Sequence, residues 1–579
     1  MNMQTVRPTG GDLLAGALKA AGVEKVFALH GGHLEAFYKG CKDHGVDLVD
    51  FRHEASAGHA ADAYARATKK LGVCVITAGP GFTNAITAIV NAQLDSVPTL
   101  FIVSSPPLRE AETNPLQGGF DQVAMATPGC KWAYRVTNTE RMPDIIALAA
   151  RKAMTGRRGA VMIDVPIDVL HMTAHSADVT APTGARLLPR PAPSASETSA
   201  IVEMLKSAKR PAIVCGVEAA FSDAQPQLVA FAEASGIPVF TSKRAHGMIP
   251  AGHRLEGHDP SNLGALVDAG APGADAFLIL GARLGLYMGG RGTRILPSDA
   301  KIAHVHMDVS EIGRIREPAI AVNADVRSTL EALVAASADV IWPDFSEWAD
   351  RVTALKGRFA QSYPETDASG GISPFHAAAE VARVMGPKAL YAIDGGETGH
   401  WAAIHARVDT PGHVMATGYL GCLGVSQGFA IGAQIARPDR RVALLAGDGG
   451  FGFNIQELDT MVRHQLPIIN VVFNNGIWGM SIHGQQIMYG QNYNAITTLG
   501  GTEYAAIAQA FGCHGEKVER FADLAPALER ALASKKPAVI EVMVDPNVVH
   551  PVTVAALGTL PDDGSEVMIP YYENVPVRR

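Results

Sequence analysis

A glycine-rich turn in the last third of the chain combines residues that suit phosphate and metal binding. The turn follows the apolar run 442–446 and consists of Gly447, Asp448, Gly449 and Gly450. Asn475 lies at the end of the next apolar segment. Glycines between a strand and a helix let backbone N–H groups approach phosphate oxygens. A carboxylate, an amide oxygen and a backbone carbonyl, which we assign to Ile477, suit Mg²⁺ once phosphate and water oxygens complete the octahedron.

Gly-Asp-Gly on its own is weak evidence, because the same three residues form common turns. Here Asp448 and Asn475 both follow predicted strands, and open α/β sheets bind ligands at the carboxyl ends of their strands. The strand–helix–strand setting therefore favours a diphosphate and magnesium site over a plain turn.

A second candidate for chemistry is Glu54, in the sequence Arg-His-Glu-Ala directly after a short apolar run. A zinc-protease interpretation fails, because the next histidine, His59, is too far along for an i, i+4 ligand pair. Glu54 could also be an exposed surface glutamate without a function. The Gly-Pro-Gly turn that contains Pro80 and leads to Asn84 follows the next predicted strand, so both segments belong to the same part of the chain.

Two histidines, His30 and His33, follow the first predicted strand, and Gln117 stands in a later Leu-Gln-Gly-Gly sequence. A lone histidine is usually structural, and a His-x-x-His pair alone is weak evidence for a metal. The position of this loop at the end of the first strand favours a catalytic interpretation.

Helical and strand patterns alternate along most of the chain, which predicts an α/β fold with helices on both faces of parallel sheets. The Pro/Ser-rich stretches 181–196 and 363–374 divide the chain into three doubly wound domains and a tail. We place these parts at residues 1–180, 195–340, 370–552 and 553–579. The tail has little periodicity and is expected to be an extended arm.

Composition narrows the class of protein. The 579 residues are 47% hydrophobic and 18% charged, with a formal net charge of −8, which is typical of a globular chain. We expect no nucleic-acid partner, because there is no basic block, and no membrane span, because no apolar run approaches ~20 residues. Six scattered cysteines and the absence of an apolar leader favour the cytoplasm.

These motifs resemble those of thiamine diphosphate-dependent enzymes, in the superfamily that contains acetohydroxyacid synthase and benzaldehyde lyase. The resemblance extends over about residues 8–550 and rests on RHEASAGHAADAYARA, TAGPGFTNA, LQGGFDQVAMA, RGAVMIDVP and GYLGCLGV. It implies a pyrimidine-binding domain over 1–180, a central nucleotide-binding-like domain over 195–340 and a diphosphate- and Mg²⁺-binding domain over 370–552. It also implies a homodimer or a dimer of dimers with active sites at subunit interfaces.

The resemblance assigns roles to single residues. Glu54 would activate the cofactor, His33 and Gln117 would handle protons at the substrate oxygen, and His30 would support them. The implied metal ligands are Asp448, Asn475 and Ile477. The remaining implied cofactor contacts are Pro80, Asn84, Glu397, Thr398, Leu423, Gly447, Gly449, Gly450, Trp478 and Gly479.

The substrate prediction rests on departures from the family pattern. Ile167, Gly399 and Gly484 stand where benzaldehyde lyase has aromatic residues, and Met480 replaces a small residue. We interpret this as an open pocket for a non-aromatic acyl group. Tyr571, Tyr572 and Arg578 in the tail are candidates for a lid over a coenzyme A thioester. The preferred prediction is therefore a 2-hydroxyacyl-CoA lyase that releases formyl-CoA and an aldehyde or ketone.

Four further functions stay open at this point. The chain is also compatible with a benzaldehyde-lyase-type acyloin lyase or carboligase, or with a cyclic 1,2-dione hydrolase, which the pair His30 and His33 would suit. Acetolactate synthase ranks lower, because we find no pattern for an FAD site. An inactive regulatory paralogue is disfavoured by the intact Glu54, Asp448 and Asn475. Whether the central domain binds ADP is left open.

Overall fold

The computed structural model describes residues 7–578 except 111, 114–115, 177–178, 183–187, 356–362, 364–370, 559 and 570–574. The chain forms two compact units. The first contains Met1–Pro189, Thr417–Asp439 and Asn454–Leu466, and the second contains Arg190–Ala416, Arg440–Phe453 and Pro467–Arg579. Apart from a C-terminal pair, the described strands form three six-stranded parallel sheets, which confirms the predicted α/β class with three doubly wound sheets.

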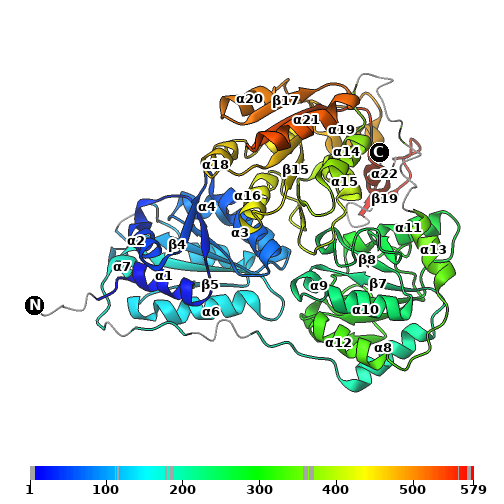
Figure 1. Cartoon of the computed structure of the whole chain (residues 1–579), viewed down its shortest axis with the longest axis horizontal. Coiled ribbons are helices and arrows are strands. Elements are labelled where there is room, and N and C mark those ends of the chain that lie inside the picture. Colours follow the sequence, from blue (N-terminus) through cyan, green and yellow to red (C-terminus); the bar gives the residue numbers. More distant parts are fainter. Residues whose placement is uncertain are drawn as a thin grey trace, which may run out of the picture. The chain divides into compact units, whose positions relative to one another are not determined.

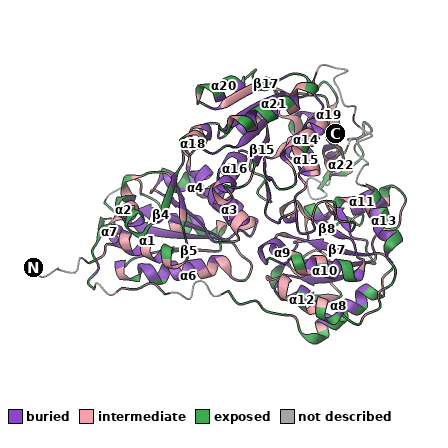
Figure 2. Cartoon of the chain, viewed as in Figure 1, coloured by how far each residue is buried: buried purple, intermediate pink, exposed green. Residues whose placement is uncertain are grey.

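The first sheet lies in the first unit and has the strand order β2-β1-β3-β4-β6-β5. Its strands are β1 (Lys25–Ala28), β2 (Asp47–Asp50), β3 (Gly72–Ile76), β4 (Thr99–Ser105), β5 (Trp132–Arg135) and β6 (Ala160–Pro166). Every residue of β3, β4 and β6 is buried, as expected for strands covered on both faces (Figure 2). The helices are α1 (Gly10–Ala20), α2 (Glu35–His44), α3 (Glu54–Thr68), α4 (Pro80–Leu94), α5 (Gln122–Ala126), α6 (Met142–Met154) and α7 (Ile167–His171).

Two helices from the last third of the chain also belong to the first unit. They are α16 (Ser426–Ala436) and α18 (Glu457–Arg463). Helix α16 packs closely against α3, because a Cβ at Gly432 would overlap the carbonyl oxygen of Ala60, and one at Gly428 would lie 2.7 Å from that of Ser56. Glycine at these two positions lets the backbones approach.

The second sheet lies in the second unit and has the order β12-β11-β10-β7-β8-β9. Its strands are β7 (Pro211–Cys215), β8 (Val239–Thr241), β9 (Glu256–His258), β10 (Ala276–Leu280), β11 (Lys301–Val305) and β12 (Ile320–Val322). Figure 1 shows α10 and α12 side by side along this sheet. Its helices are α8 (Ala195–Lys206), α9 (Val217–Phe221), α10 (Gln225–Ser235), α11 (Ser261–Asp268), α12 (Val326–Ala336) and α13 (Ser346–Ala354).

The third sheet, also in the second unit, has the order β14-β13-β15-β16-β18-β17. Its strands are β13 (Leu390–Ile393), β14 (Val414–Ala416), β15 (Val442–Gly447), β16 (Ile469–Asn474), β17 (His514–Val518) and β18 (Ala538–Met543). Its helices are α14 (Pro374–Met385), α15 (Gly396–His405), α17 (Asp448–Gly452), α19 (Gly479–Tyr489), α20 (Tyr504–Ala510) and α21 (Phe521–Ser534). No described helix has the length and apolarity that crossing a membrane requires.

The C-terminal segment differs from the expected extended arm. It contains α22 (Pro551–Leu557) and an antiparallel pair of strands, β19 (Val567–Ile569) and β20 (Val575–Val577). Leu557, Leu560 and Ile569 form a small apolar cluster with Met488, and burial of these side chains explains the regular structure. Of the proposed lid residues, Tyr571 and Tyr572 lie outside the described residues, and Arg578 is exposed.

Candidate cofactor site and active site

The glycine turn joins the end of β15 directly to α17. A Cβ at Gly449 would lie 2.5 Å from the Trp478 ring, and a Cβ at Gly450 would lie 2.8 Å from Asp394 Oδ1. Neither position has room for a side chain without movement of its neighbour. Thr398, at the start of α15, is also close, with its Oγ1 3.2 Å from where a Cβ on Gly447 would lie. The turn is therefore packed tightly against its neighbours. Three of its four residues are glycines, so phosphate oxygens could approach its backbone N–H groups.

The three predicted metal ligands, Asp448, Asn475 and Ile477, directly follow the neighbouring strands β15 and β16. The N–H of Gly476 donates to Asp448 Oδ2 at 3.1 Å, and the N–H of Ile477 donates to Asn475 Oδ1 at 3.2 Å. Tyr504 Oη donates to the carbonyl of Asp448 at 2.8 Å, which holds the turn from the other side. Asp448 is 3% exposed, and this burial raises the pKa of its carboxyl to about 6.

The residues present fit a magnesium diphosphate group. Asp448 is a buried carboxylate that a bound cation would stabilise. The other two proposed ligands, the amide oxygen of Asn475 and the carbonyl of Ile477, are also oxygen ligands, which Mg²⁺ prefers. Within the described residues, no three His, Cys, Asp or Glu side chains are grouped so that they could hold a metal ion. A metal at Asp448 would thus depend on amide, carbonyl and phosphate oxygens for its other ligands.

Glu397, a predicted cofactor contact, has several partners within the protein. It is 7% exposed and accepts hydrogen bonds from His483 Nδ1 at 2.7 Å, the N–H of His550 at 3.2 Å and Thr553 Oγ1 at 2.5 Å. Burial lowers the pKa of His483, but the hydrogen bond to Glu397, the charge of Glu397 and the carbonyl of Pro546 together outweigh burial, and the pKa is raised. These bonds hold the start of α22 against α15, and sequence reasoning missed His483 and Thr553.

Glu54 is the first residue of α3 and is buried, so the surface-glutamate interpretation is wrong. His53 caps the helix by accepting the N–H of Ala55 at its Nδ1, which sets the chain direction at Glu54. Asn84 Nδ2 donates to Glu54 Oε2 at 3.0 Å, and a Cβ at Gly81 would lie 3.8 Å from Oε1. The structure thus brings together Glu54 and the turn that contains Pro80, as the motif predicts.

The loop after β1, which carries His30 and His33, is more exposed to solvent than Glu54. His30 is exposed, with its Nε2 3.1 Å from Glu35 Oε1 and its ring stacked on Tyr38. His33 is half-buried, and burial, followed by the charge of His171, lowers its pKa. Because its pKa is lowered, the imidazole of His33 is neutral at pH 7 and can accept a proton.

Gln117 has two marks of a functional residue. Its φ is +58°, and its Oε1 is buried without a hydrogen-bond partner among the described residues. It lines a cavity of about 70 Å³ together with Ser105, Phe120 and Arg135. An unsatisfied acceptor beside a cavity is suited to a ligand hydroxyl or N–H.

The loops after β1, β3 and β4 meet at the carboxyl edge of the first sheet. A Cβ at Gly31 would overlap Thr77, and one at Gly79 would lie 2.9 Å from the Cα of Gln117. Gln122, which sequence reasoning missed, accepts the N–H of Gly79 at 2.9 Å and donates to the carbonyl of Ser104. The signal was present, because Gln122 stands in the same conspicuous segment as Gln117.

The predicted open pocket is not found at two of its three positions. A Cβ at Gly399 would overlap the carbonyl oxygen of Asp394, and one at Gly484 would lie 2.6 Å from Leu557 Cδ1. The space next to these glycines is filled by backbone and by α22, so a missing aromatic ring does not mean free volume. Ile167, Leu423 and Met480 are partly exposed.

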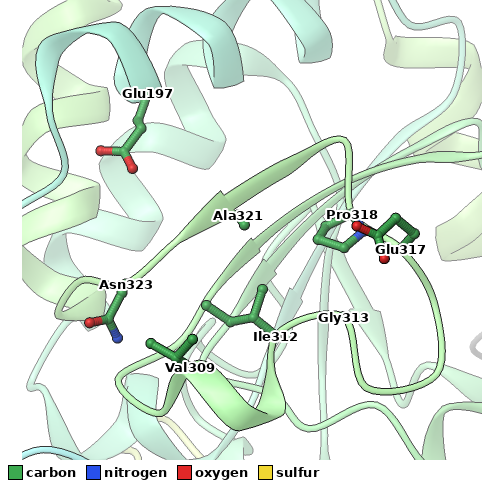
Figure 3. Close-up of a pocket in the computed structure, with 8 residues that line it drawn as sticks. All are labelled: Glu197, Val309, Ile312, Gly313, Glu317, Pro318, Ala321 and Asn323. Atoms are coloured by element: carbon green, nitrogen blue, oxygen red, sulfur yellow. The ribbon is translucent and has the colours of Figure 1, made fainter.

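The larger of two described cavities is lined by none of the predicted site residues. It has a volume of about 440 Å³ and is formed by the β11–β12 connection, β12 and the start of α8. Figure 3 shows the carboxylates of Glu197 and Glu317 on different sides of it, and the lining includes no lysine or arginine. This cavity lacks the positive charge expected for an ADP site.

Three family models match the chain. They describe the N-terminal TPP binding domain, the central domain and the C-terminal TPP binding domain of thiamine pyrophosphate enzymes, and they match residues 8–125, 198–333 and 394–542. The glycine turn and Asn475 lie within the third match, and Glu54, His33 and Gln117 lie within the first.

Curated relatives cover nearly the whole chain. A probable acetolactate synthase of Mycobacterium bovis is 33% identical over 551 residues, which is 93% of this chain and 96% of the relative. The acetolactate synthase large subunit IlvG of Mycobacterium tuberculosis has the same values. The acetolactate synthase large subunit of Corynebacterium glutamicum is 32% identical over 93% of this chain and 87% of its own length.

These relatives overturn the predicted substrate. The prediction of a 2-hydroxyacyl-CoA lyase that releases formyl-CoA is contradicted, because acetolactate synthases match the chain over 93% of its length. The physical error was to equate small residues with open space. The low rank given to acetolactate synthase, which rested on the missing FAD pattern, is overturned by the same relatives.

Proposed function

Because the chain belongs to the thiamine pyrophosphate enzyme family, we propose that it is a carbon–carbon synthase of the acetolactate synthase type. Similarity to acetolactate synthases over 93% of the chain is the observation that supports this most strongly. Acetolactate consists of an acetyl group bonded to the hydroxyl-bearing carbon of a 2-hydroxyacid. Two molecules of pyruvate supply both parts with loss of one CO₂, so the substrate class is a small 2-oxoacid.

The reaction needs no net oxidation or reduction. Two pyruvates and one acetolactate plus CO₂ are at the same overall oxidation level, so chemistry alone demands no flavin. The missing FAD pattern, which lowered the rank of this function, is thus no argument against it. Thiamine diphosphate supplies, when bound, a heterocycle that stabilises negative charge on the carbonyl carbon of the donor.

The diphosphate end would be held by the third sheet. The backbone of Gly447–Gly450 would approach the phosphate oxygens, and Asp448, Asn475 and the carbonyl of Ile477 would hold Mg²⁺. The buried Asp448 supports this assignment, because no lysine, arginine or histidine among the described residues forms an ion pair with it.

The pyrimidine end would be served by Glu54. Asn84 occupies Oε2 of this carboxylate, which leaves Oε1 to exchange a proton with the aminopyrimidine. The burial of Glu54 excludes water from that exchange. His33, neutral at pH 7, would accept or return a proton at the substrate oxygen, and Gln117 would orient that oxygen.

Assembly and location are separate parts of the proposal. We expect a homodimer or a dimer of dimers, which light scattering of the purified holoenzyme tests. The cytoplasmic location is tested by fractionation. ADP binding in the central domain has no support from the acidic cavity near Glu197 and is not part of the function we propose.

The test is acetolactate formation. Purified protein is incubated with thiamine diphosphate, Mg²⁺ and pyruvate, and the product is converted to acetoin by acid and quantified. We expect product from the wild type and little from Glu54→Gln, with Glu203→Gln, an exposed residue of α8, as the matched control. No acetolactate from the wild type, together with cleavage of benzoin, would overturn the proposal.

A further inference from the structure

Three basic side chains from distant parts of the sequence meet within the second unit. Lys243 lies in the short 3₁₀ helix Lys243–Ala245 just after β8, His400 lies in α15, and His550 caps α22. Lys243 Nζ donates to His400 Nδ1 at 2.8 Å, and the rings of His400 and His550 are 5.4 Å apart. None of these residues has a role in the function described above.

The charge of Lys243 has no close counterion. Within the part of the chain that the structure describes, it forms no ion pair, and Asp259 acts on it only at longer range. Arg244 adds positive charge nearby. Burial is the main reason that the pKa of Lys243 is lowered to about 8. A half-buried ammonium whose hydrogen-bond partner is an imidazole is unusual unless an anion joins it.

His550 offers a second donor beside this lysine. Its Nδ1 accepts the N–H of Val552 at 3.0 Å, so the ring proton is on Nε2. That Nε2 is buried and has no partner among the described residues, and the side chain is only 6% exposed. The ring packs 4.1 Å from that of Trp401, which fixes its position. An unsatisfied buried N–H costs free energy that an incoming acceptor would recover.

The cluster lies close to the glycine turn. Helix α15, which carries His400, also carries Thr398, whose Oγ1 is within van der Waals reach of Gly447. Helix α15 begins directly after β13, so Thr398 and His400, both in its first half, lie near the carboxyl edge of the third sheet, where open α/β sheets bind their ligands.

We propose that Lys243, positioned by His400 and assisted by the Nε2–H of His550, binds the carboxylate of the substrate. One ammonium and one N–H donor match the two oxygens of a singly charged carboxylate, and no arginine fork suited to a phosphate is part of the cluster. Lys243 is then a specificity-determining residue that selects acids over neutral carbonyl compounds. This inference rests on the proposed function for the identity of the acid.

Binding without turnover tests the inference separately from the reaction. The probe is oxamate, an unreactive planar analogue of a 2-oxoacid, and oxamide is its neutral counterpart. Titration calorimetry with the holoenzyme compares the wild type, Lys243→Met and Lys243→Arg. Lys388→Met, on an exposed lysine of the same unit, is the matched control.

We expect oxamate to bind the wild type and Lys388→Met equally, Lys243→Arg within about threefold, and Lys243→Met about tenfold or more weakly. Oxamide is expected to show no difference between the variants. Equal oxamate affinity of Lys243→Met and the wild type, or no binding of oxamate to the wild type, would overturn the inference. Lys243→Arg keeps the test valid if Lys243→Met fails to fold. Failure of acetolactate synthesis with intact oxamate selectivity would count against the proposed function alone.

Discussion

The first and third sheets have the same strand order but differ in how the side chains at their carboxyl edges are held. The order β2-β1-β3-β4-β6-β5 corresponds, strand for strand, to β14-β13-β15-β16-β18-β17. At the carboxyl edge of the third sheet, Asp448 is buried and held by backbone and side-chain partners. At the same edge of the first sheet, His30 is exposed and Gln117 has an unsatisfied oxygen. The scaffold is shared, and the loops decide whether the carboxyl edge is tightly held or open.

The largest expected effect concerns Asp448, at the carboxyl edge of the third sheet. Asp448→Asn removes the one charged side chain among the three proposed protein ligands of the metal, so we expect Mg²⁺ and thiamine diphosphate to bind about 100-fold or more weakly, with turnover lost. Calorimetric titration of the two ligands measures this. Asp299→Asn, an exposed residue of the same unit, is the control. Unchanged affinity in Asp448→Asn would mean that the cofactor is held elsewhere.

Glu54→Gln distinguishes the proposed role of Glu54 in proton exchange from cofactor binding at the glycine turn. The carboxylate lies in the first unit, away from the glycine turn in sequence, and its role is proton exchange. We therefore expect turnover to fall about 100-fold while thiamine diphosphate affinity changes by less than about threefold. Parallel turnover and binding measurements decide this. Equal losses of binding and turnover would make Glu54 a binding residue.

A pair of glycines tests how tightly each edge is packed. Gly399, after β13, has no room for a Cβ, whereas Gly32, after β1, has nothing within 4 Å of that position. We expect Gly399→Ala to lower the free energy of unfolding by about 1–3 kcal/mol and Gly32→Ala to change it by less than about 0.5 kcal/mol. Thermal or urea unfolding measures both. Similar values for the two variants would remove the contrast between the edges.

The smallest expected effect separates the two histidines. His33 is half-buried with a lowered pKa, and His30 is exposed. We expect His33→Gln to reduce kcat about tenfold or more and His30→Gln to reduce it less than about threefold. Because the lowered pKa keeps His33 neutral at pH 7, turnover of the wild type should decline only as the pH falls below 6.5, and His33→Gln should lack that decline. A larger effect from His30→Gln would reverse the assignment.

Features encoded in one short stretch were predictable from the sequence. The apolar strand that leads into the glycine turn depends on neighbours in the chain, and the structure has it as expected. The three-sheet α/β fold followed from the alternation of strand and helix patterns.

Features that depend on tertiary packing were not predictable. The sequence around Gly484 does not show that Leu557 occupies its side, and this led to the wrong substrate. The helix α22 in the expected extended arm is stabilised by contacts with Met488, far away in the chain. The meeting of Lys243, His400 and His550 likewise arises from three elements with no local signal.

The most direct test of the proposed activity is the stoichiometry of pyruvate consumption by the holoenzyme. With thiamine diphosphate and Mg²⁺ present, we expect one acetolactate and one CO₂ for every two pyruvates consumed. Release of CO₂ without acetolactate, or no consumption of pyruvate by an enzyme that has bound its cofactor, would contradict it.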